Sequence, residues 1–167
     1  MKFVTPETAK ESRLDSQNRG GTEPIAFSRP YFGKEEADAA AAAVASGWIV
    51  GGTRLAEFEA RFAATCGSQH AVGVSNWPAG AFLVLHAWGI GPGDEVIVPS
   101  LTFIASVNVI RHCGATPVFA DIDPHTFNVD PARMARKITP RTRALIPVDQ
   151  LGLPCDIDAI NALAYRH

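Results

Sequence analysis

The chain has 167 residues, of which 47% are hydrophobic and 19% charged. This balance is typical of a globular rather than a disordered protein, and the length allows one domain with a real core. The formal net charge of −2 and the lack of a basic cluster argue against a nucleic-acid-binding role. The apolar runs are too short to cross a membrane, and the first residues do not resemble a signal peptide, so we expect a cytoplasmic protein. The scattered cysteines and histidines form no zinc motif, and the cysteines are expected to be reduced thiols.

Residues 1–24 are polar and charged, and they predict a flexible N-terminal tail. The remainder, residues 25–167, alternates between stretches with helical apolar spacing and short β-branched runs. The predicted helices span residues 35–46, 53–65, 79–88, 102–112, 131–137 and 156 to the end. The predicted strands span residues 71–75, 95–98, 117–120 and 144–148.

The alternation of strands and helices predicts an α/β fold with a mostly parallel sheet and flanking helices. The helix at 79–88 is apolar nearly all round, which predicts that it is buried. The last predicted element is a helix, and a helix in such a fold usually leads into another strand. We therefore expect the sheet of this chain to be incomplete.

Two segments follow predicted strands, where open α/β sheets place their ligands. The first is the turn from Ser75 to Ala81, which leads into a helix whose N-terminus could attract an anion. On spacing alone, an ordinary strand-to-helix turn is the favoured interpretation of these residues, and Pro78 supplies neither an N–H nor a hydroxyl group. The second is the run from Gly89 to Phe103, in which a glycine-rich turn and a buried strand lead into a loop.

Four segments fall in an order and at spacings that resemble a known family: residues 46–52, 75–81, 89–103 and 147–158. Together they resemble the sugar aminotransferases of the DegT/DnrJ/EryC1/StrS type, which use pyridoxal phosphate (PLP) and have the large domain of PLP-dependent transferases of fold type I. The resemblance covers residues 25–167. It implies the N-terminal portion of that large domain, so we expect the domain to be truncated.

This resemblance implies cofactor contacts at two places. Trp77, Pro78 and Ala79 stand in the loop that holds the PLP phosphate, although Trp77 and Pro78 replace the small residue and the hydroxyl residue that the family usually has. Phe103 stands where an aromatic ring stacks on the pyridine ring of the cofactor. A phenylalanine buried in the core is the alternative for Phe103.

The same resemblance implies substrate contacts. Trp48 and Ile49 lie in the loop that helps to form the sugar site of the family. Asp149 follows the strand predicted at 144–148, at a position where many members have histidine. From its residue type alone, Asp149 either lines the site or holds the turn that follows the strand.

PLP chemistry needs a lysine for the Schiff base and an acid near the pyridine nitrogen, and the resemblance implies that both lie beyond residue 167. The lysines of the chain, Lys2, Lys10, Lys34 and Lys137, are predicted to be solvated surface residues. The full-length protein is expected to be a homodimer that transfers an amino group from an amino acid to a nucleotide-linked keto sugar, whereas this portion alone is expected to be inactive. The alternatives are a non-catalytic remnant or binding module on the same scaffold, and a PLP-dependent sugar dehydratase.

Overall fold

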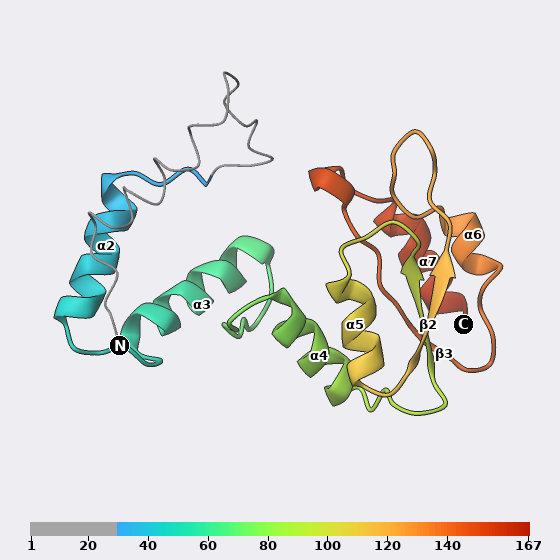
Figure 1. The fold of residues 1–167 in the computed structure, drawn as a ribbon, viewed down its shortest axis with the longest axis horizontal. Helices are drawn as coiled ribbons and strands as arrows, with labels where there is room; N and C mark the ends of the chain where they lie inside the picture. The colour runs from blue at the N-terminus through green and yellow to red at the C-terminus, as the bar shows by residue number, and fades with distance from the viewer. Residues whose placement is uncertain (1–29) are drawn as a thin grey trace, which may run out of the picture. The chain divides into compact units, whose positions relative to one another are not determined.

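The computed structural model of the chain describes residues 30–167, so the tail predicted at residues 1–24 lies outside the described residues (Figure 1). The chain divides into two compact units between Ala56 and Glu57. Among the helices in the described range, none combines the length and the apolar character that a membrane span requires.

The first unit contains α2 (Lys34–Ala45) and the start of α3 (Thr53–Cys66). The alanine-rich sequence of α2 has high helix propensity, and the Glu36 carboxylate accepts the N–H of Gly33 at 2.6 Å at its N-terminus. Gly47 follows the helix with φ +70°, a left-handed conformation that glycine adopts at little cost. Both helices agree with their predicted ranges to within one residue at each end.

The second unit is built on a three-stranded parallel sheet. The central strand, β1 (Glu95–Pro99), lies between β2 (Thr116–Ala120) and β3 (Thr142–Leu145). β1 is buried along its whole length, as expected for a continuous apolar strand covered on both faces. The predicted parallel α/β fold is therefore confirmed.

Helices cover both faces of this sheet (Figure 1). α4 (Trp77–Ala87) and α5 (Ala105–His112) pack on one face, and α6 (Pro131–Ala135) and α7 (Ile157–Arg166) pack on the other. Asp130 and Asp156 cap α6 and α7, because both carboxylates accept N–H groups of the first helical turn. The resulting three layers are typical of α/β domains.

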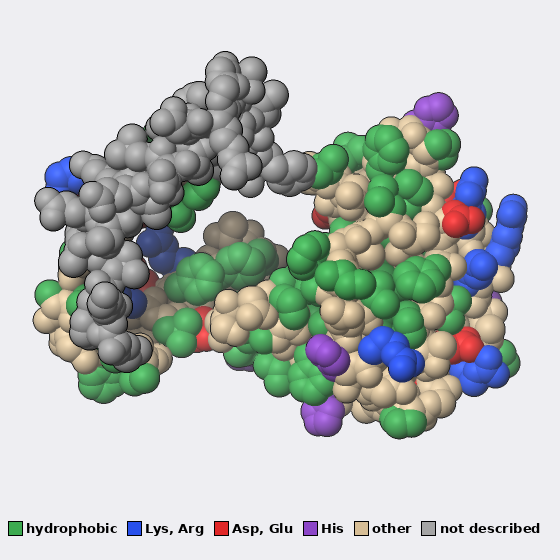
Figure 2. Space-filling model, in the orientation of Figure 1, with side chains coloured by type: hydrophobic (Ala, Val, Ile, Leu, Met, Phe, Trp, Pro, Cys, Tyr) green, Lys and Arg blue, Asp and Glu red, His purple; other side chains and the backbone are tan. Residues whose placement is uncertain are grey.

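The surface of the second unit is largely apolar on the face shown in Figure 2, where hydrophobic side chains (green) extend over its centre and charged ones lie mainly toward its right and lower edges. Many large hydrophobic side chains of the described residues are exposed. Those of the second unit include Trp77, Leu83, Trp88, Phe103, Phe119 and Leu151.

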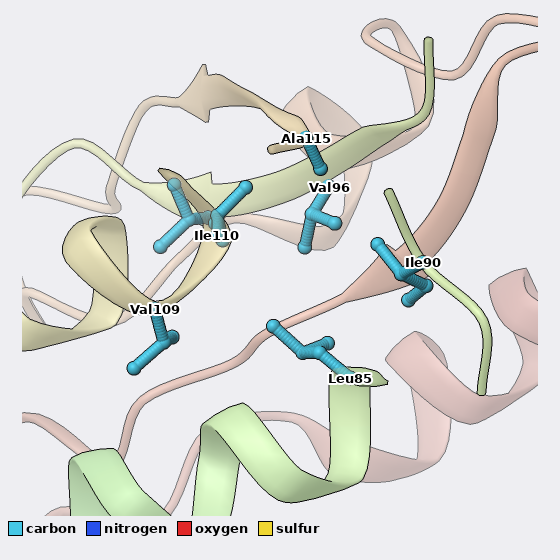
Figure 3. Close-up of a cluster of buried hydrophobic side chains, with 7 residues drawn as sticks. Leu85, Ile90, Val96, Val109, Ile110 and Ala115 are labelled. Atoms are coloured by element: carbon cyan, nitrogen blue, oxygen red, sulfur yellow. The ribbon is translucent and has the colours of Figure 1, made fainter. Parts of the chain in front are cut away.

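The side chains of β1 alternate between two hydrophobic clusters, because successive residues of a strand point to opposite faces. Val96 and Val98 belong to the cluster under α4 and α5, and Ile97 belongs to the cluster under α6 and α7. Figure 3 shows the first cluster, in which side chains from the two helices, β1 and the connecting segments converge. The other buried members of the first cluster are Leu85, Ile90, Val109, Ile110 and Ala115. Those of the second are Ala120, Val129, Met134, Ile160 and Leu163.

The prediction of a strand at residues 71–75 was wrong. These residues pair with none of the strands in the described range, and a β-branched sequence forms a strand only where a neighbour accepts its hydrogen bonds. The N–H of Gly73 instead donates to the Glu59 carboxylate of α3 at 2.7 Å.

Three predicted helices differ in extent or burial. α6 ends at Ala135 rather than at residue 137. α5 begins at Ala105 rather than at residue 102, because a tight turn closed by the Ser106 N–H and the Phe103 carbonyl precedes it. α4 begins two residues before its predicted start and is buried only at Leu85, whereas Leu83 is 52% exposed. An apolar sequence alone does not reveal which neighbours cover a helix.

At the amino end of the sheet, the buried Glu95 joins β1 to the segment that precedes β3. The Thr139 hydroxyl donates to its Oε2 at 2.5 Å, and Arg141 donates to its Oε1 from Nε at 2.9 Å and from Nη2 at 2.5 Å. These bonds, that of Thr139 foremost, hold the pKa of the Glu95 carboxyl below its usual value. This cluster lies at the end of β1 opposite the loop that follows the strand.

Candidate functional site

An open cavity of about 680 Å³ lies in the second unit, beyond the carboxyl ends of β1 and β3. Its walls come from the first turn of α4, the loop between β1 and α5, and the segment between β3 and α7. This is the edge at which parallel α/β sheets bind ligands. The cavity brings together four residues that the sequence suggested, namely Trp77, Pro78, Phe103 and Asp149, whereas Ala79 does not line it.

The N-terminus of α4 forms the first wall, and its backbone donors are largely committed. Asn76 caps the helix, since its Oδ1 accepts the Ala79 N–H at 3.0 Å and its carbonyl accepts the Gly80 N–H at 3.3 Å. Pro78 has no N–H. Among the described residues, this leaves the N–H of Trp77 as the one donor of this first turn without a protein partner.

A phosphate group is held by several convergent N–H groups, hydroxyls or cations. This helix end offers one available N–H, and no lysine or arginine belongs to the cavity lining. This helix end by itself therefore supplies too few donors for the phosphate of PLP, and the hydroxyls of Thr102 and Ser106 are further donors in the cavity lining. The amides of Ala79 and Gly80 are not available to a phosphate, because Asn76 already satisfies both.

Phe103 forms part of the second wall. Its side chain is 76% exposed, which excludes the alternative of a phenylalanine buried in the core of the described residues. Behind it, the hydroxyls of Thr102 and Ser106 hydrogen-bond to each other at 2.9 Å. An exposed aromatic ring beside an open cavity suits the face of a flat, largely apolar ligand, so stacking on the PLP ring stays a prediction that this geometry permits.

Asp149 lies in the third wall, where it both lines the cavity and holds a turn, and its contact with a substrate stays a prediction. Its Oδ1 accepts the Cys155 N–H at 2.9 Å across a six-residue turn, and the carboxylate also lines the cavity. Hydrogen bonds from the Cys155 backbone and thiol lower the pKa of Asp149, so the group is ionised at neutral pH. Burial and then the Asp149 carboxylate raise the pKa of the Cys155 thiol to about 11, which keeps this thiol protonated and a poor nucleophile.

Asn128 had no role in the prediction from the sequence, yet it is buried, with 4% of its surface exposed. Its Oδ1 accepts the Gln150 N–H at 2.8 Å, and its Nδ2 donates to the Leu153 carbonyl at 2.9 Å. These partners lie 22 and 25 residues further along the chain, within the segment between β3 and α7 that supplies the third wall of the cavity. No local sequence signal links positions so far apart, so only the fold identifies the contact.

Trp48 and Ile49 lie in the first unit, where both are exposed. They line a hollow formed within residues 43–55, and the Trp48 Nε1 donates to the carbonyl of Gly51 at 2.9 Å. A Cβ on Gly52 would meet this indole at 2.3 Å, so a larger residue there would displace the Trp48 side chain from its present position. Neither residue belongs to the lining of the cavity in the second unit, and their contact with substrate stays a prediction.

The sequence model of the DegT/DnrJ/EryC1/StrS aminotransferase family matches residues 30–167. Spore coat polysaccharide biosynthesis protein SpsC of Bacillus subtilis (strain 168) is 49% identical over 143 residues, which are 86% of this chain and 37% of that protein. GDP-perosamine synthase of Caulobacter vibrioides is 47% identical over 144 residues, which are 86% of this chain and 39% of that protein.

The chain is also similar in structure to the PLP form of Spr1654 from Streptococcus pneumoniae. The TM-score is 0.79 at 37% identity, over 83% of this chain and 36% of that one. The chain thus spans less than two fifths of the length of each of these proteins. Since the family model covers most of the chain and the relatives share almost half of the aligned residues, the chain belongs to the DegT/DnrJ/EryC1/StrS aminotransferase family.

Proposed function

We propose that this chain is the N-terminal portion of the large domain of a PLP-dependent aminotransferase, which moves an amino group from an amino acid to a nucleotide-linked keto sugar. The observation that carries the proposal is the cavity at the carboxyl edge of the sheet, where Trp77, Phe103 and Asp149 meet in a member of this family. The names of the relatives, a spore coat polysaccharide biosynthesis protein and a GDP-perosamine synthase, support a sugar substrate. The PLP form of Spr1654 supports the cofactor.

In this proposal the described residues supply binding surface rather than proton transfer. Phe103 offers a flat apolar face, and Asp149 offers a carboxylate that is ionised and fixed by the Cys155 N–H. No lysine lines the cavity, so the 167-residue chain should not catalyse amino transfer by itself. The amino-acid donor, a homodimeric assembly and a cytoplasmic location stay predictions from the family resemblance.

The test starts with the intact mass of the native protein from its own host, followed by its PLP content and its activity with glutamate and a panel of nucleotide-linked keto sugars. We expect a mass well above that of the 167-residue chain, bound PLP and amino transfer. The recombinant 167-residue chain with added PLP is the matched control, and it should be inactive. A longer native protein that carries no PLP and transfers no amino group would contradict the proposal.

A non-catalytic binding module is the second candidate, and the N-terminus of α4 favours it. Pro78 and the committed amides of Ala79 and Gly80 leave little to hold a phosphate, whereas the apolar walls remain suited to a ring. A native protein with the mass of the 167-residue chain and no transaminase activity would favour this candidate over the first.

A further inference from the structure

The segment between β3 and α7 contains a left-handed turn. Leu151 adopts φ +53° and ψ +27°, and the next residue, Gly152, adopts φ +84°. Glycine tolerates this conformation, but a leucine side chain does so only where neighbouring contacts impose it. The Leu151 side chain is itself 85% exposed, so its own packing does not hold the turn.

Asn128 bonds to both sides of this turn. Its Oδ1 accepts the N–H of Gln150, immediately before Leu151, and its Nδ2 donates to the carbonyl of Leu153, immediately after Gly152. One buried side chain therefore closes the base of the turn with a donor and an acceptor at once. An amide is the side-chain group that supplies both in this arrangement.

Asn128 is in turn held by its own loop. The Asp123 Oδ1 accepts the N–H groups of His125 and Thr126 at 2.8 and 3.0 Å, and the Asp123 N–H donates to the Asn128 carbonyl at 2.8 Å. The Thr126 hydroxyl accepts the Asn128 N–H at 3.3 Å. The backbone of Asn128 is thus held by bonds within its own loop, and these bonds do not involve the turn at Leu151 to which its side chain is hydrogen-bonded.

We propose that Asn128 is a positioning residue of the candidate site: it holds the left-handed turn and thereby fixes the wall formed by residues 147–155. The proposal rests on the proposed function only in taking this cavity as the site. The turn lies between Asp149 and Cys155, which both line the cavity. Its release would therefore move both residues and disturb the hydrogen bond between them.

The Cys155 thiol reports on this wall. Burial, the hydrogen bond with Asp149 and a smaller effect of Asp156 raise its pKa to about 11. If the turn relaxes, Cys155 separates from Asp149 and becomes more exposed, and its pKa falls toward the usual value of a thiol. Since the thiolate is the reactive form, alkylation of Cys155 measures the position of the wall.

The test compares Asn128→Ala with Asn161→Ala, which removes an exposed asparagine from α7. Hydrogen exchange is measured at the Gln150 amide, and alkylation of Cys155 is followed across pH by peptide mass spectrometry, which separates it from Cys66 and Cys113. We expect Asn128→Ala to raise both rates by about tenfold near neutral to mildly alkaline pH, while the amides of β1 keep their protection. Asn161→Ala should leave both rates unchanged.

Equal rates in Asn128→Ala and Asn161→Ala would overturn the proposal. An equal rise at the β1 amides would also overturn it, because Asn128 would then support only overall stability. Asn128→Asp serves if the alanine variant does not fold: it keeps an acceptor for Gln150 and loses the donor to Leu153, so it should raise Cys155 alkylation, and an unchanged rate would refute the proposal. None of these readouts requires PLP or amino transfer, so failure here is distinct from failure of the proposed function.

Discussion

At the first turn of α4, a proline stands where an ordinary residue would present an N–H to the cavity. The flanking donors do not compensate, since Asn76 uses its side chain and its carbonyl to satisfy Ala79 and Gly80. The positive end of the helix is still there, but an anion has little to bond to. The identity of residue 78 is therefore expected to govern whether the cavity distinguishes a phosphorylated ligand from its unphosphorylated form.

Pro78→Ser should increase the preference of the chain for PLP over pyridoxal by at least about a hundredfold, because it restores one N–H and adds one hydroxyl, and hydrogen bonds to a charged group contribute about 1.5–3 kcal/mol each. Calorimetric titration with the two compounds gives the ratio of their dissociation constants. Pro78→Ala, which restores the N–H alone, is the matched control and should give an intermediate ratio. A ratio that is the same in all three proteins would show that this helix end does not contact the phosphate.

At the scale of the elements, the sheet is tied together at its amino end by the contact between Glu95 of β1 and the residues that lead into β3. Thr139 and Arg141 both donate to this buried carboxylate, which lowers its pKa. A carboxyl whose pKa is lower in the folded than in the unfolded state stabilises the fold above its unfolded pKa. That contribution is lost as the pH falls through the folded pKa.

We therefore expect the wild-type chain to lose stability as the pH falls below about 5, where a glutamate of ordinary pKa begins to protonate, and part of this loss should come from Glu95. Urea unfolding of the wild type and of Glu95→Gln across this range measures the effect. The difference in stability between them should be largest near neutral pH and should shrink on acidification. The exposed Glu57→Gln on α3 is the control, and a constant difference for Glu95→Gln would mean that the charge of Glu95 does not stabilise the fold.

At the scale of the whole molecule, the stability of the second unit depends on a three-stranded sheet whose central strand, β1, contributes side chains to both hydrophobic clusters. Ile97 is fully buried under α6 and α7, while its neighbours Val96 and Val98 are buried under α4 and α5. Apolar side chains elsewhere in this unit are often exposed, so burial is concentrated around β1.

Ile97→Ala should lower the free energy of unfolding by about 2–5 kcal/mol, since it removes buried methyl groups and leaves a cavity between β1 and the two helices. Leu83→Ala on α4 is the matched control, because this side chain is 52% exposed, and it should cost less than about 1 kcal/mol. Urea unfolding followed by circular dichroism provides both values. Should Ile97→Ala not fold, Ile97→Val is expected to cost about 0.5–1.5 kcal/mol. Similar losses for Ile97 and Leu83 would contradict the central role of β1.

The sequence alone determined those features that depend on local chemistry. The apolar run at 95–98 predicted β1, and the alternation of elements predicted the parallel sheet. Four segments also sufficed for the family. In each case the signal is carried by residues that are close together along the chain, because strand period, helix caps and turn residues act over only a few positions.

Only the tertiary structure decided which neighbours each residue meets. It showed that residues 71–75 have no strand to pair with, that Phe103 is exposed beside a cavity, and that Asp149 both lines this cavity and holds a turn. It also revealed that Asn128 grips Gln150 and Leu153, more than 20 residues away. Such contacts depend on how distant segments pack, and no local pattern of the sequence predicts the free energy of that packing.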